Sequence, residues 1–358
     1  MQCSLASEDF AAVCNRLFGL VNQPGKPVKR SRFLLKNSQI RMKVLVTGSS
    51  GFIGQALAQR LKAEGWEVQG LDKLPGPSTD FVCDILDARQ LQETVQACAP
   101  DALVHLAARI DIDETADVSD YPANVEGVRN TIDAVRRTPS IKRTAWTSSQ
   151  LVCRVDYVPK SDTDYNPDSS YGRSKVVTEQ IVREQDGGGT QWCLVRPTTV
   201  WGPGMSAHYR RFLRMIQRGY YFHIGREPLL KSFSYVGNIT YQYRQLLKAS
   251  PEQMHRKTFY LADYQPLDLV AWGDAFQRGL RARPIPRIPV LLARAMAHSG
   301  DAAIALGLKQ FPLTSRRLKN ILTEYQFDLT ATEAICGPLP STFQQSVDET
   351  VEWFNNLS

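Results

Sequence analysis

Two side chains that can activate a hydroxyl group lie four residues apart near the middle of this chain. Tyr171 and Lys175 begin and end the run Tyr-Gly-Arg-Ser-Lys, and residues at positions i and i+4 of a helix share one face. A phenol has a pKa near ~10 and is a poor base at neutral pH, but a neighbouring ammonium favours its ionised form. The spacing therefore predicts a general base for an alcohol. A chance pairing on a helix surface is the alternative interpretation.

A further hydroxyl group is expected close to this pair. Ser149 follows the apolar run at residues 143–147, which is typical of a buried strand. Ligands of doubly wound sheets bind at the carboxyl ends of the strands. Ser149 would therefore face the same ligand as the tyrosine.

Three glycines follow the first apolar run, residues 44–46, at intervals of three. Gly48 allows a sharp turn, Gly51 allows the backbone to approach a pyrophosphate, and Gly54 allows a helix to pack closely on the strand. The free amide groups at the start of that helix would face the anion. The pattern predicts a dinucleotide site.

An acidic residue follows at the distance this site requires. Asp72 ends the second apolar run, 18 residues after Gly54, close to the ~20 at which a carboxylate accepts from the adenosine ribose hydroxyls. A carboxylate there would repel a 2′-phosphate, so NAD is favoured over NADP, although Lys73 is adjacent. The alternative is that Asp72 only forms the turn before Pro75.

Short apolar runs alternate with amphipathic segments from Met42 on. The alternation predicts an α/β fold, a Rossmann-type doubly wound parallel sheet covered by helices on both faces. We expect residues 42–200 to form this NAD-binding domain and residues 201–358 a smaller, helix-rich, substrate-binding region. Residues 233–260 are expected to return to the sheet. The runs lie at residues 44–46, 68–71, 81–83, 102–106, 143–147 and 193–195.

Three loops at the strand ends are assigned from their positions. Asp84-Ile85 would touch the adenine or, as an equal alternative, Asp84 would cap a helix. His105 is interpreted as a packed core histidine. Residues 196–204, Arg-Pro-Thr-Thr-Val-Trp-Gly-Pro-Gly, form a rigid segment suited to wall the nicotinamide.

Composition excludes several classes of protein. The first 41 residues hold seven Lys or Arg and two acids, which leaves a charge balance near neutral from Met42 on and argues against a nucleic-acid partner.

The seven cysteines show no CxxC and no metal-ligand spacing with the histidines, which predicts free thiols, no metal and a cytoplasmic location. No run reaches the ~18 apolar residues of a membrane span. Residues 1–41 are expected to lie outside the fold, as a transit segment or a misplaced start.

Taken in order, the motifs resemble the extended short-chain dehydrogenase/reductase superfamily, specifically its NAD-dependent epimerase/dehydratase family of nucleotide-sugar enzymes. The likeness covers nearly everything from Met42. It is carried by Thr47-Gly-Ser-Ser-Gly-Phe-Ile-Gly54, Asp84-Ile85, His105-Leu-Ala-Ala108, Asn124-Val-Glu-Gly127, Thr147-Ser-Ser149, Tyr171-x-x-x-Lys175, Arg196-Pro197 and Tyr235-Val-Gly-Asn238.

By position, the resemblance implies that Tyr171 is the base, that Lys175 binds the nicotinamide ribose and lowers the tyrosine pKa, and that Ser149 binds the reacting oxygen. It implies a nucleotide-sugar substrate, bound by Ser149 with Arg109, Thr199 and Lys231, and a homodimer. Besides Tyr171 and Lys175, the implied cofactor contacts are Gly48, Ser50, Gly51, Phe52, Ile53, Gly54, Asp72, Asp84, Ile85, Leu106, Ala107, Ala108, Asn124 and Pro197.

Differences from the family pattern reduce the number of reactions expected for this chain. Dehydratases of the family carry Asp-Glu after the catalytic hydroxyl, whereas Gln150-Leu151 follows Ser149 here, which disfavours dehydration. Epimerases often carry Asn at the position of Thr199 and Arg at that of Lys231. The resemblance thus favours a nucleotide-sugar epimerase or related sugar oxidoreductase, expected in surface-polysaccharide biosynthesis. The alternatives are a reductase or dehydrogenase of a non-nucleotide alcohol or ketone, such as a steroid or flavonoid, and a non-catalytic dinucleotide sensor.

Overall fold

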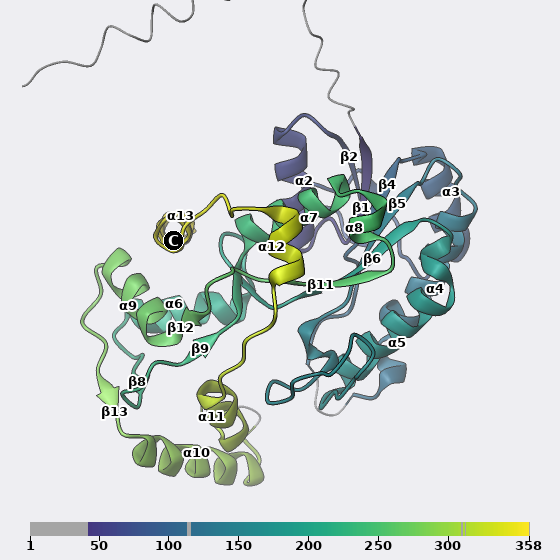
Figure 1. Cartoon of the computed structure of the whole chain (residues 1–358). Helices are drawn as coiled ribbons and strands as arrows, with labels where there is room; N and C mark the ends of the chain where they lie inside the picture. The colour runs from purple at the N-terminus through teal and green to yellow at the C-terminus, as the bar shows by residue number, and fades with distance from the viewer. Residues whose placement is uncertain (1–41, 113–115, 309–310, 312, 358) are drawn as a thin grey trace, which may run out of the picture. The chain divides into compact units, whose positions relative to one another are not determined.

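The computed structural model describes residues 42–112, 116–308, 311 and 313–357 (Figure 1). The basic segment 1–41 lies outside the described residues, so its exclusion from the fold stays a prediction. Within the described residues, no helix is long and apolar enough to cross a membrane. The same residues contain no cluster of His, Cys, Asp and Glu arranged to hold a metal ion, and their five cysteines are buried free thiols.

A seven-stranded sheet, parallel throughout, forms the centre of the fold and confirms the predicted doubly wound class. Its order is β11-β6-β5-β4-β1-β2-β3. The central strands are buried on both faces, as parallel strands between helix layers must be. The strands are β1 (Lys43–Thr47), β2 (Glu67–Asp72), β3 (Phe81–Val82), β4 (Ala102–His105), β5 (Arg143–Thr147), β6 (Gln191–Pro197) and β11 (Lys257–Leu261).

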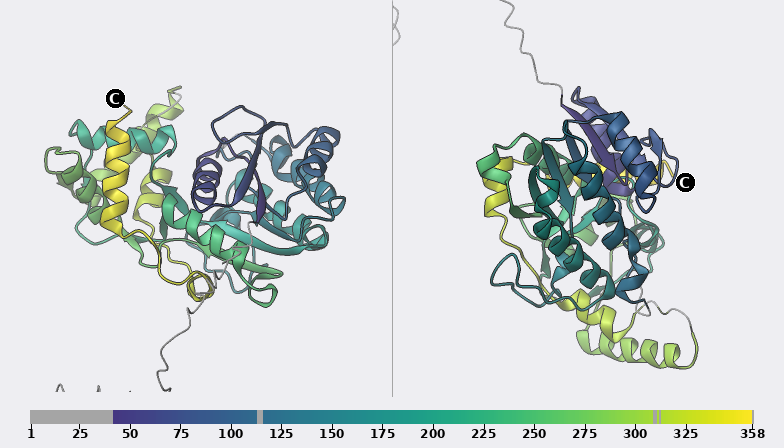
Figure 2. Two further views of the ribbon diagram at one scale, coloured as in Figure 1. Left: turned by 90° about the horizontal axis from the view of Figure 1, so that it is seen from above. Right: turned by 90° about the vertical axis from the view of Figure 1, so that its right-hand side faces the viewer.

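Helices cover both faces of this sheet (Figures 1 and 2). One apolar cluster joins β1 and β11 to α2 (Phe52–Ala63) and α7 (Val236–Lys248). A second cluster, on the other face, joins the sheet to α3 (Ala88–Cys98), α4 (Pro122–Arg136) and α5 (Ser170–Glu184). The short turns η1 (Val118–Asp120), η2 (Gln150–Val152) and η3 (Asp186–Gly188) join these elements.

The C-terminal part is built on an aromatic core. Trp201 packs edge-on against Trp272 and Phe276, with ring centroids 5.7 Å away in both cases. Phe52, in the first turn of α2, packs on the same cluster and so joins this core to the sheet domain. The elements are β7 (Thr199–Trp201), α6 (Ala207–Gln217), β8 (His223–Ile224), β9 (Leu230–Lys231), β10 (Phe233–Tyr235), β12 (Leu267–Asp268), α9 (Leu269–Gly279), β13 (Arg287–Ile288), α10 (Val290–Ala305), α11 (Ser315–Leu322) and α13 (Phe343–Asn355).

Residues 233–260 divide between the two parts. The first strand of this segment, β10, pairs with β7 in a separate two-stranded sheet, whereas α7 packs on α2 and β11 pairs with β6. The short helix α8 (Pro251–Met254) lies between them. Near the C-terminus, α12 (Thr330–Cys336) also returns to pack on α7 and β11.

A buried ion pair ties β6 to α5. The Arg196 guanidinium donates Nε to Glu179 Oε1 at 2.7 Å and a second nitrogen to Oε2 at 2.8 Å, and both side chains are essentially inaccessible to solvent. Arg196 also binds the Asp162 carbonyl at 2.6 Å and the Tyr260 hydroxyl at 3.0 Å. The pair raises the pKa of Arg196 above its usual range, so the guanidinium stays charged and fixes the position of α5.

Removing one member of this pair should destabilise the protein strongly. Arg196→Met leaves the Glu179 carboxylate buried without its cation, which typically costs about 3–5 kcal/mol. Urea unfolding measures the loss. The matched control is Arg89→Met, which breaks the exposed Arg89–Glu93 pair and should leave the unfolding midpoint unchanged. Equal midpoints for the two variants would show that the buried pair does not hold α5.

Candidate active site

The turn between β1 and α2 requires glycine at two positions. Gly48 has a φ of +74°, and a Cβ there would lie 2.7 Å from the Ala107 nitrogen. A Cβ on Gly54 would lie 2.1 Å from the Gly48 carbonyl oxygen. Neither position accepts a side chain, and the absence of side chains lets α2 start directly beside the loop after β4.

The start of α2 fits the diphosphate of a dinucleotide. Gly51 is exposed, and within the described residues a Cβ there would approach only the Gly48 carbonyl, at 3.1 Å. Phe52 and Ile53 open the helix, where backbone amides lack intrahelical acceptors. Open space beside free amides is suited to an anion. The Ser50 hydroxyl instead donates to the Leu74 carbonyl at 2.8 Å, so Ser50 supports the turn with its side chain.

Asp72 forms the turn that the sequence offered as its alternative role, and its contact with the ribose stays a prediction. Its Oδ2 accepts from the Ser50 amide and its Oδ1 from the Leu74 amide, each at 3.0 Å. The carboxylate is thus both a turn former and a fixed negative charge beside the glycine turn. Each oxygen retains acceptor capacity for a ribose hydroxyl, and the charge opposes a 2′-phosphate.

The structure corrects one interpretation of the Asp84-Ile85 pair. Asp87, not Asp84, caps α3, because its side chain accepts from the Gln90 amide at 3.0 Å. Asp84 closes a local turn by accepting from the Leu86 amide at 3.0 Å. Ile85 is only 5% exposed, so little of its side chain is available to a ligand.

The loop after β4 is held by Asn124 and Thr47. The Asn124 amide accepts from the Arg109 backbone at 2.8 Å and donates to the Arg109 carbonyl and the Ser174 hydroxyl, at 3.0 and 2.8 Å. Asn124 is fully buried, so in this structure it acts by positioning the loop and not by direct contact with a ligand. Thr47 Oγ1 accepts from the Leu106 and Ala107 amides at 3.3 Å. Ala108, between them and Arg109, is half-buried.

The side chains of Arg109 and His105 both bond to neighbouring residues of the protein. The Arg109 guanidinium makes a bidentate pair with Asp111, at 2.8 and 2.7 Å, and lies over the Tyr121 ring at 4.7 Å. It is therefore committed to its own loop, although the sequence assigned it to the substrate. His105 is a core residue, bonded to Thr47 at 3.0 Å, and burial lowers its pKa to about 3.

Ser149, Tyr171 and Lys175 come together at the carboxyl end of β5. Ser149 is close enough to Tyr171 to act on the pKa of its hydroxyl, and the Ser149 oxygen accepts from the Leu151 amide at 3.1 Å. One turn along α5, Lys175 Nζ donates to the Thr147 carbonyl at 3.0 Å. All three are at most 8% exposed. The end of β5 thus fixes both members of the predicted pair.

Burial moves the pKa values of the two groups in opposite directions. It raises the pKa of Tyr171 to about 12, against a smaller lowering by Ser149. It lowers the pKa of Lys175 to about 8, against a smaller raising by Glu179. Lys175 does not contribute to the Tyr171 pKa here, so the lowering that the sequence predicted has to come with the bound cofactor, whose oxidised nicotinamide is a cation.

Two of the predicted substrate residues, Thr199 and Lys231, contact the same tyrosine, Tyr325. Pro197 ends β6 and leads through Thr198 into β7, where Thr199 Oγ1 lies 3.2 Å from the Tyr325 hydroxyl. Lys231 Nζ lies 5.1 Å from the Tyr325 ring centroid and donates to the Asn320 carbonyl.

Sequence analysis missed Tyr325 because no motif surrounds it and it lies far along the chain from its partners. Its hydroxyl also lies near Gln150, the residue after Ser149, which acts to lower the Tyr325 pKa. Tyr325 therefore joins the C-terminal part to the catalytic end of β5. A neutral amide stands where a dehydratase of this family carries an acid.

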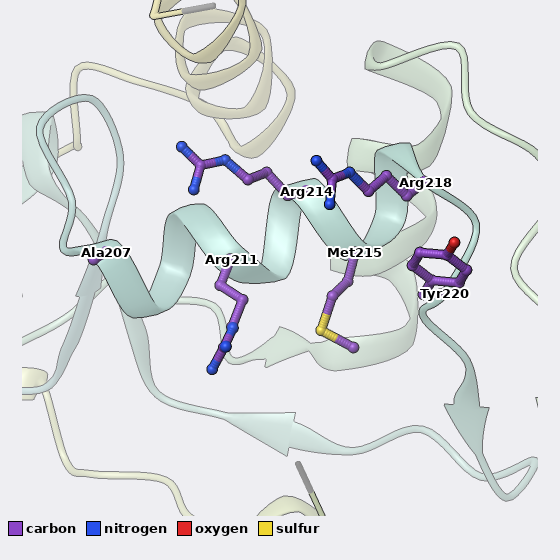
Figure 3. A pocket seen from close by; sticks show the side chains of 6 residues that line it. All are labelled: Ala207, Arg211, Arg214, Met215, Arg218 and Tyr220. Atoms are coloured by element: carbon purple, nitrogen blue, oxygen red, sulfur yellow. The ribbon is translucent and has the colours of Figure 1, made fainter. Parts of the chain in front are cut away.

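Two hollows lie near or beyond these residues, and Tyr325 lines the first of them. One, of about 660 Å³, lies between residues 155–162 and 324–332. The other, of about 640 Å³, lies along α6 and is lined by Arg211, Arg214 and Arg218 with Tyr220 (Figure 3). Neither contains a predicted site residue, so size alone does not mark the active site.

Comparison with known proteins agrees with this geometry. Residues 44–240 match the profile of the NAD dependent epimerase/dehydratase family. The N-acetyl-alpha-D-glucosaminyl-diphospho-ditrans,octacis-undecaprenol 4-epimerase of Escherichia coli O157:H7 is 27% identical over 316 residues, 87% of this chain and 94% of the relative. The 3-beta-hydroxysteroid dehydrogenase of Mycolicibacterium neoaurum is 29% identical over 222 residues, 56% of this chain and 59% of the relative. The crystal structure of the UDP-glucose 4-epimerase of Thermus thermophilus in complex with NAD shares the fold, with a TM-score of 0.66 and 20% identity over 88% of this chain and 100% of that chain.

NAD binding should release a proton from Tyr171. The Tyr171 pKa is about 12 without cofactor and should fall beside the positive nicotinamide. Because the complex then holds fewer protons, NAD affinity should rise with pH between the two pKa values, by up to about tenfold per pH unit. Fluorescence titration over this pH range measures it.

Tyr171→Phe is the control for this titration, because Lys175 titrates in both proteins and only the tyrosine is removed. NADH, whose ring is neutral, should show a weaker pH dependence than NAD. Identical pH dependence of NAD affinity in wild type and Tyr171→Phe would contradict the role of Tyr171 as the base.

Proposed function

Because the chain belongs to the NAD-dependent epimerase/dehydratase family, we propose that this enzyme is a 4-epimerase of a diphosphate-linked sugar. The observation that carries the proposal is the burial of Ser149 and Tyr171 together at the end of β5, with Lys175 one turn away on α5 and bonded to the Thr147 carbonyl. Bound NAD supplies a reversible hydride acceptor at the reacting carbon. Gly51, Phe52, Ile53 and Asp72 would hold it.

In this mechanism Tyr171 transfers the proton and Ser149 binds the reacting oxygen. Tyr171 takes the proton of the sugar 4-hydroxyl as the C4 hydride leaves, and Ser149 holds the same oxygen by a hydrogen bond. After the keto sugar has turned over, Tyr171 would return the proton to the C4 oxygen, while bound NAD would supply the hydride to the other face of the sugar. The sequence of steps ends with no net oxidation, so the cofactor is regenerated in each turnover.

The local chemistry favours epimerisation over dehydration. Gln150 carries no acidic proton to give to a leaving hydroxide, and within the described residues its buried side-chain oxygen Oε1 has no hydrogen-bond partner. The Escherichia coli relative, named for 4-epimerisation of a diphosphate-linked sugar, is matched over nearly its whole length. This supports a substrate with a diphosphate, whether its carrier is a nucleoside or a polyprenyl lipid. A role in surface-polysaccharide biosynthesis and a homodimer stay predictions.

One observation favours a dehydrogenase of a non-nucleotide alcohol as the second candidate. Lys231 and Thr199, the groups expected to bind a diphosphate, are bonded to Asn320 and Tyr325 within the protein. The relative from Mycolicibacterium neoaurum is named for steroid oxidation. The two functions differ in the fate of the hydride, because a dehydrogenase releases it as NADH.

A sugar labelled with deuterium at C4 distinguishes the two functions. The purified protein, without added NAD, should convert UDP-linked or polyprenyl-diphosphate-linked N-acetylglucosamine to a mixture of C4 epimers. The label should be retained in both, because the hydride returns to the carbon that released it. Proton NMR detects the epimers and the label. Accumulation of NADH with a 4-keto product would instead identify a dehydrogenase.

Tyr171→Phe should abolish this conversion without unfolding the protein. The ring keeps its packing, but the proton acceptor is lost, which typically lowers the rate by ~10²–10⁴. Tyr220→Phe, at an exposed tyrosine, is the matched control and should turn over at the wild-type rate. A Tyr171→Phe variant as fast as this control would refute the assignment.

A further inference from the structure

The helix α10 exposes apolar side chains that most helices bury. Ala293, Ala297 and Gly300 pack against the segment that carries α11. On the outer side, Leu291 is 78% exposed, and Leu306, in the turn after the helix, is 86% exposed. The large exposed residues, here called the apolar surface of α10, are Leu291, Leu292, Ile304, Leu306 and Leu308. Large apolar residues exposed at both ends of one helix indicate a candidate interaction surface.

The apolar surface lies in a basic stretch of the sequence. Residues 281–319 contain eight Lys or Arg and one acid, whereas the other residues from Met42 on carry a net negative charge. The single acid, Asp301, is engaged, because it accepts from the Ser315 amide at 3.1 Å and lies 3.9 Å from His298. The near-neutral total from Met42 conceals this separation of charge.

Apolar and cationic residues together select one kind of partner. Leucines that enter the acyl boundary and arginines that bind anionic headgroups are the two contributions by which a helix lies on a bilayer. A second copy of the chain fits poorly, because a two-fold contact would bring the same cations together. With 16 residues, α10 is shorter than the ~20 needed to span a membrane.

We propose that α10, with its basic flanks, docks this protein on the surface of an anionic lipid bilayer. The helix pair α10–α11 lies at an edge of the C-terminal part, away from the seven-stranded sheet (Figures 1 and 2). It is also linked to the candidate site, since the Asn320 carbonyl of α11 accepts from Lys231. Lys319 lies 3.3 Å from Asp156, in the segment that follows Ser149.

Docking through this pair brings the substrate side of the site close to the bilayer. A sugar whose diphosphate is carried by a membrane lipid could then enter without leaving the membrane. This consequence rests on the proposed function, whereas the docking itself does not. Vesicle binding therefore tests the docking separately from the reaction.

The test uses the full chain and sedimentation with vesicles. Phosphatidylcholine vesicles containing about one-third phosphatidylglycerol should bind the protein, pure phosphatidylcholine should bind it weakly, and added salt should weaken binding. Leu291→Asp/Leu306→Asp should lower the partition coefficient by about tenfold or more. Its Tm and NAD affinity should stay at the wild-type values, because both side chains are exposed.

The matched control is Tyr220→Asp/Leu357→Asp, which places the same charges at exposed apolar residues outside α10 and should bind vesicles like wild type. All variants keep residues 1–41, so a loss confined to the α10 variant assigns binding to this helix. Absent binding to anionic vesicles, or equal binding by both variants, overturns the proposal. A dimer that the α10 variant dissociates would also overturn it, because a second copy would then cover this surface.

Discussion

The buried contact between Arg196 and Glu179 holds the catalytic helix in place. Glu179 lies one turn beyond Lys175 on α5, and Arg196 comes from the end of β6, so the pair joins the base and its ammonium to the edge of the sheet where substrates bind. Arg196 also holds the chain at Asp162, in the loop after Ser149. A small rotation of α5 would carry the Tyr171 hydroxyl away from Ser149. The ion pair is therefore part of the geometry of the reaction, although neither residue touches the reacting atoms.

Burial determines the chemistry of the site before a ligand is bound. It favours the neutral forms of Tyr171 and Lys175, and it keeps His105 uncharged beneath them. A phenol with a pKa of about 12 is not a base at neutral pH. In the proposed mechanism Tyr171 would therefore need the positive charge of the bound cofactor to act as the base. This arrangement links the chemistry to occupancy of the dinucleotide site.

The substrate side of the site is assembled from segments far apart in the chain. Tyr325 bonds Thr199, lies near Gln150 and stacks against Lys231, and Lys231 in turn donates to α11. A substrate diphosphate would have to compete with these internal bonds. The same network connects the candidate site to the helix pair that carries the exposed leucines. These contacts therefore connect the proposed substrate residues to the proposed membrane-docking surface of α10.

Local patterns in the sequence determined the sheet class, the glycine turn and the spacing of Tyr171 and Lys175. Each depends on residues a few positions apart, whose relation is fixed by strand or helix geometry. Asp84 as a helix cap was a local interpretation and was wrong, since Asp87 has the better position three residues before the Gln90 amide. Only the tertiary structure decided the partners of Asn124, Arg109, Lys231 and Tyr325. Their contacts depend on how distant segments pack, and neither the residue type nor its neighbours along the chain reveal that. The exposure of α10 also depends on the tertiary structure, because the same apolar sequence can be buried by another segment or left exposed to solvent.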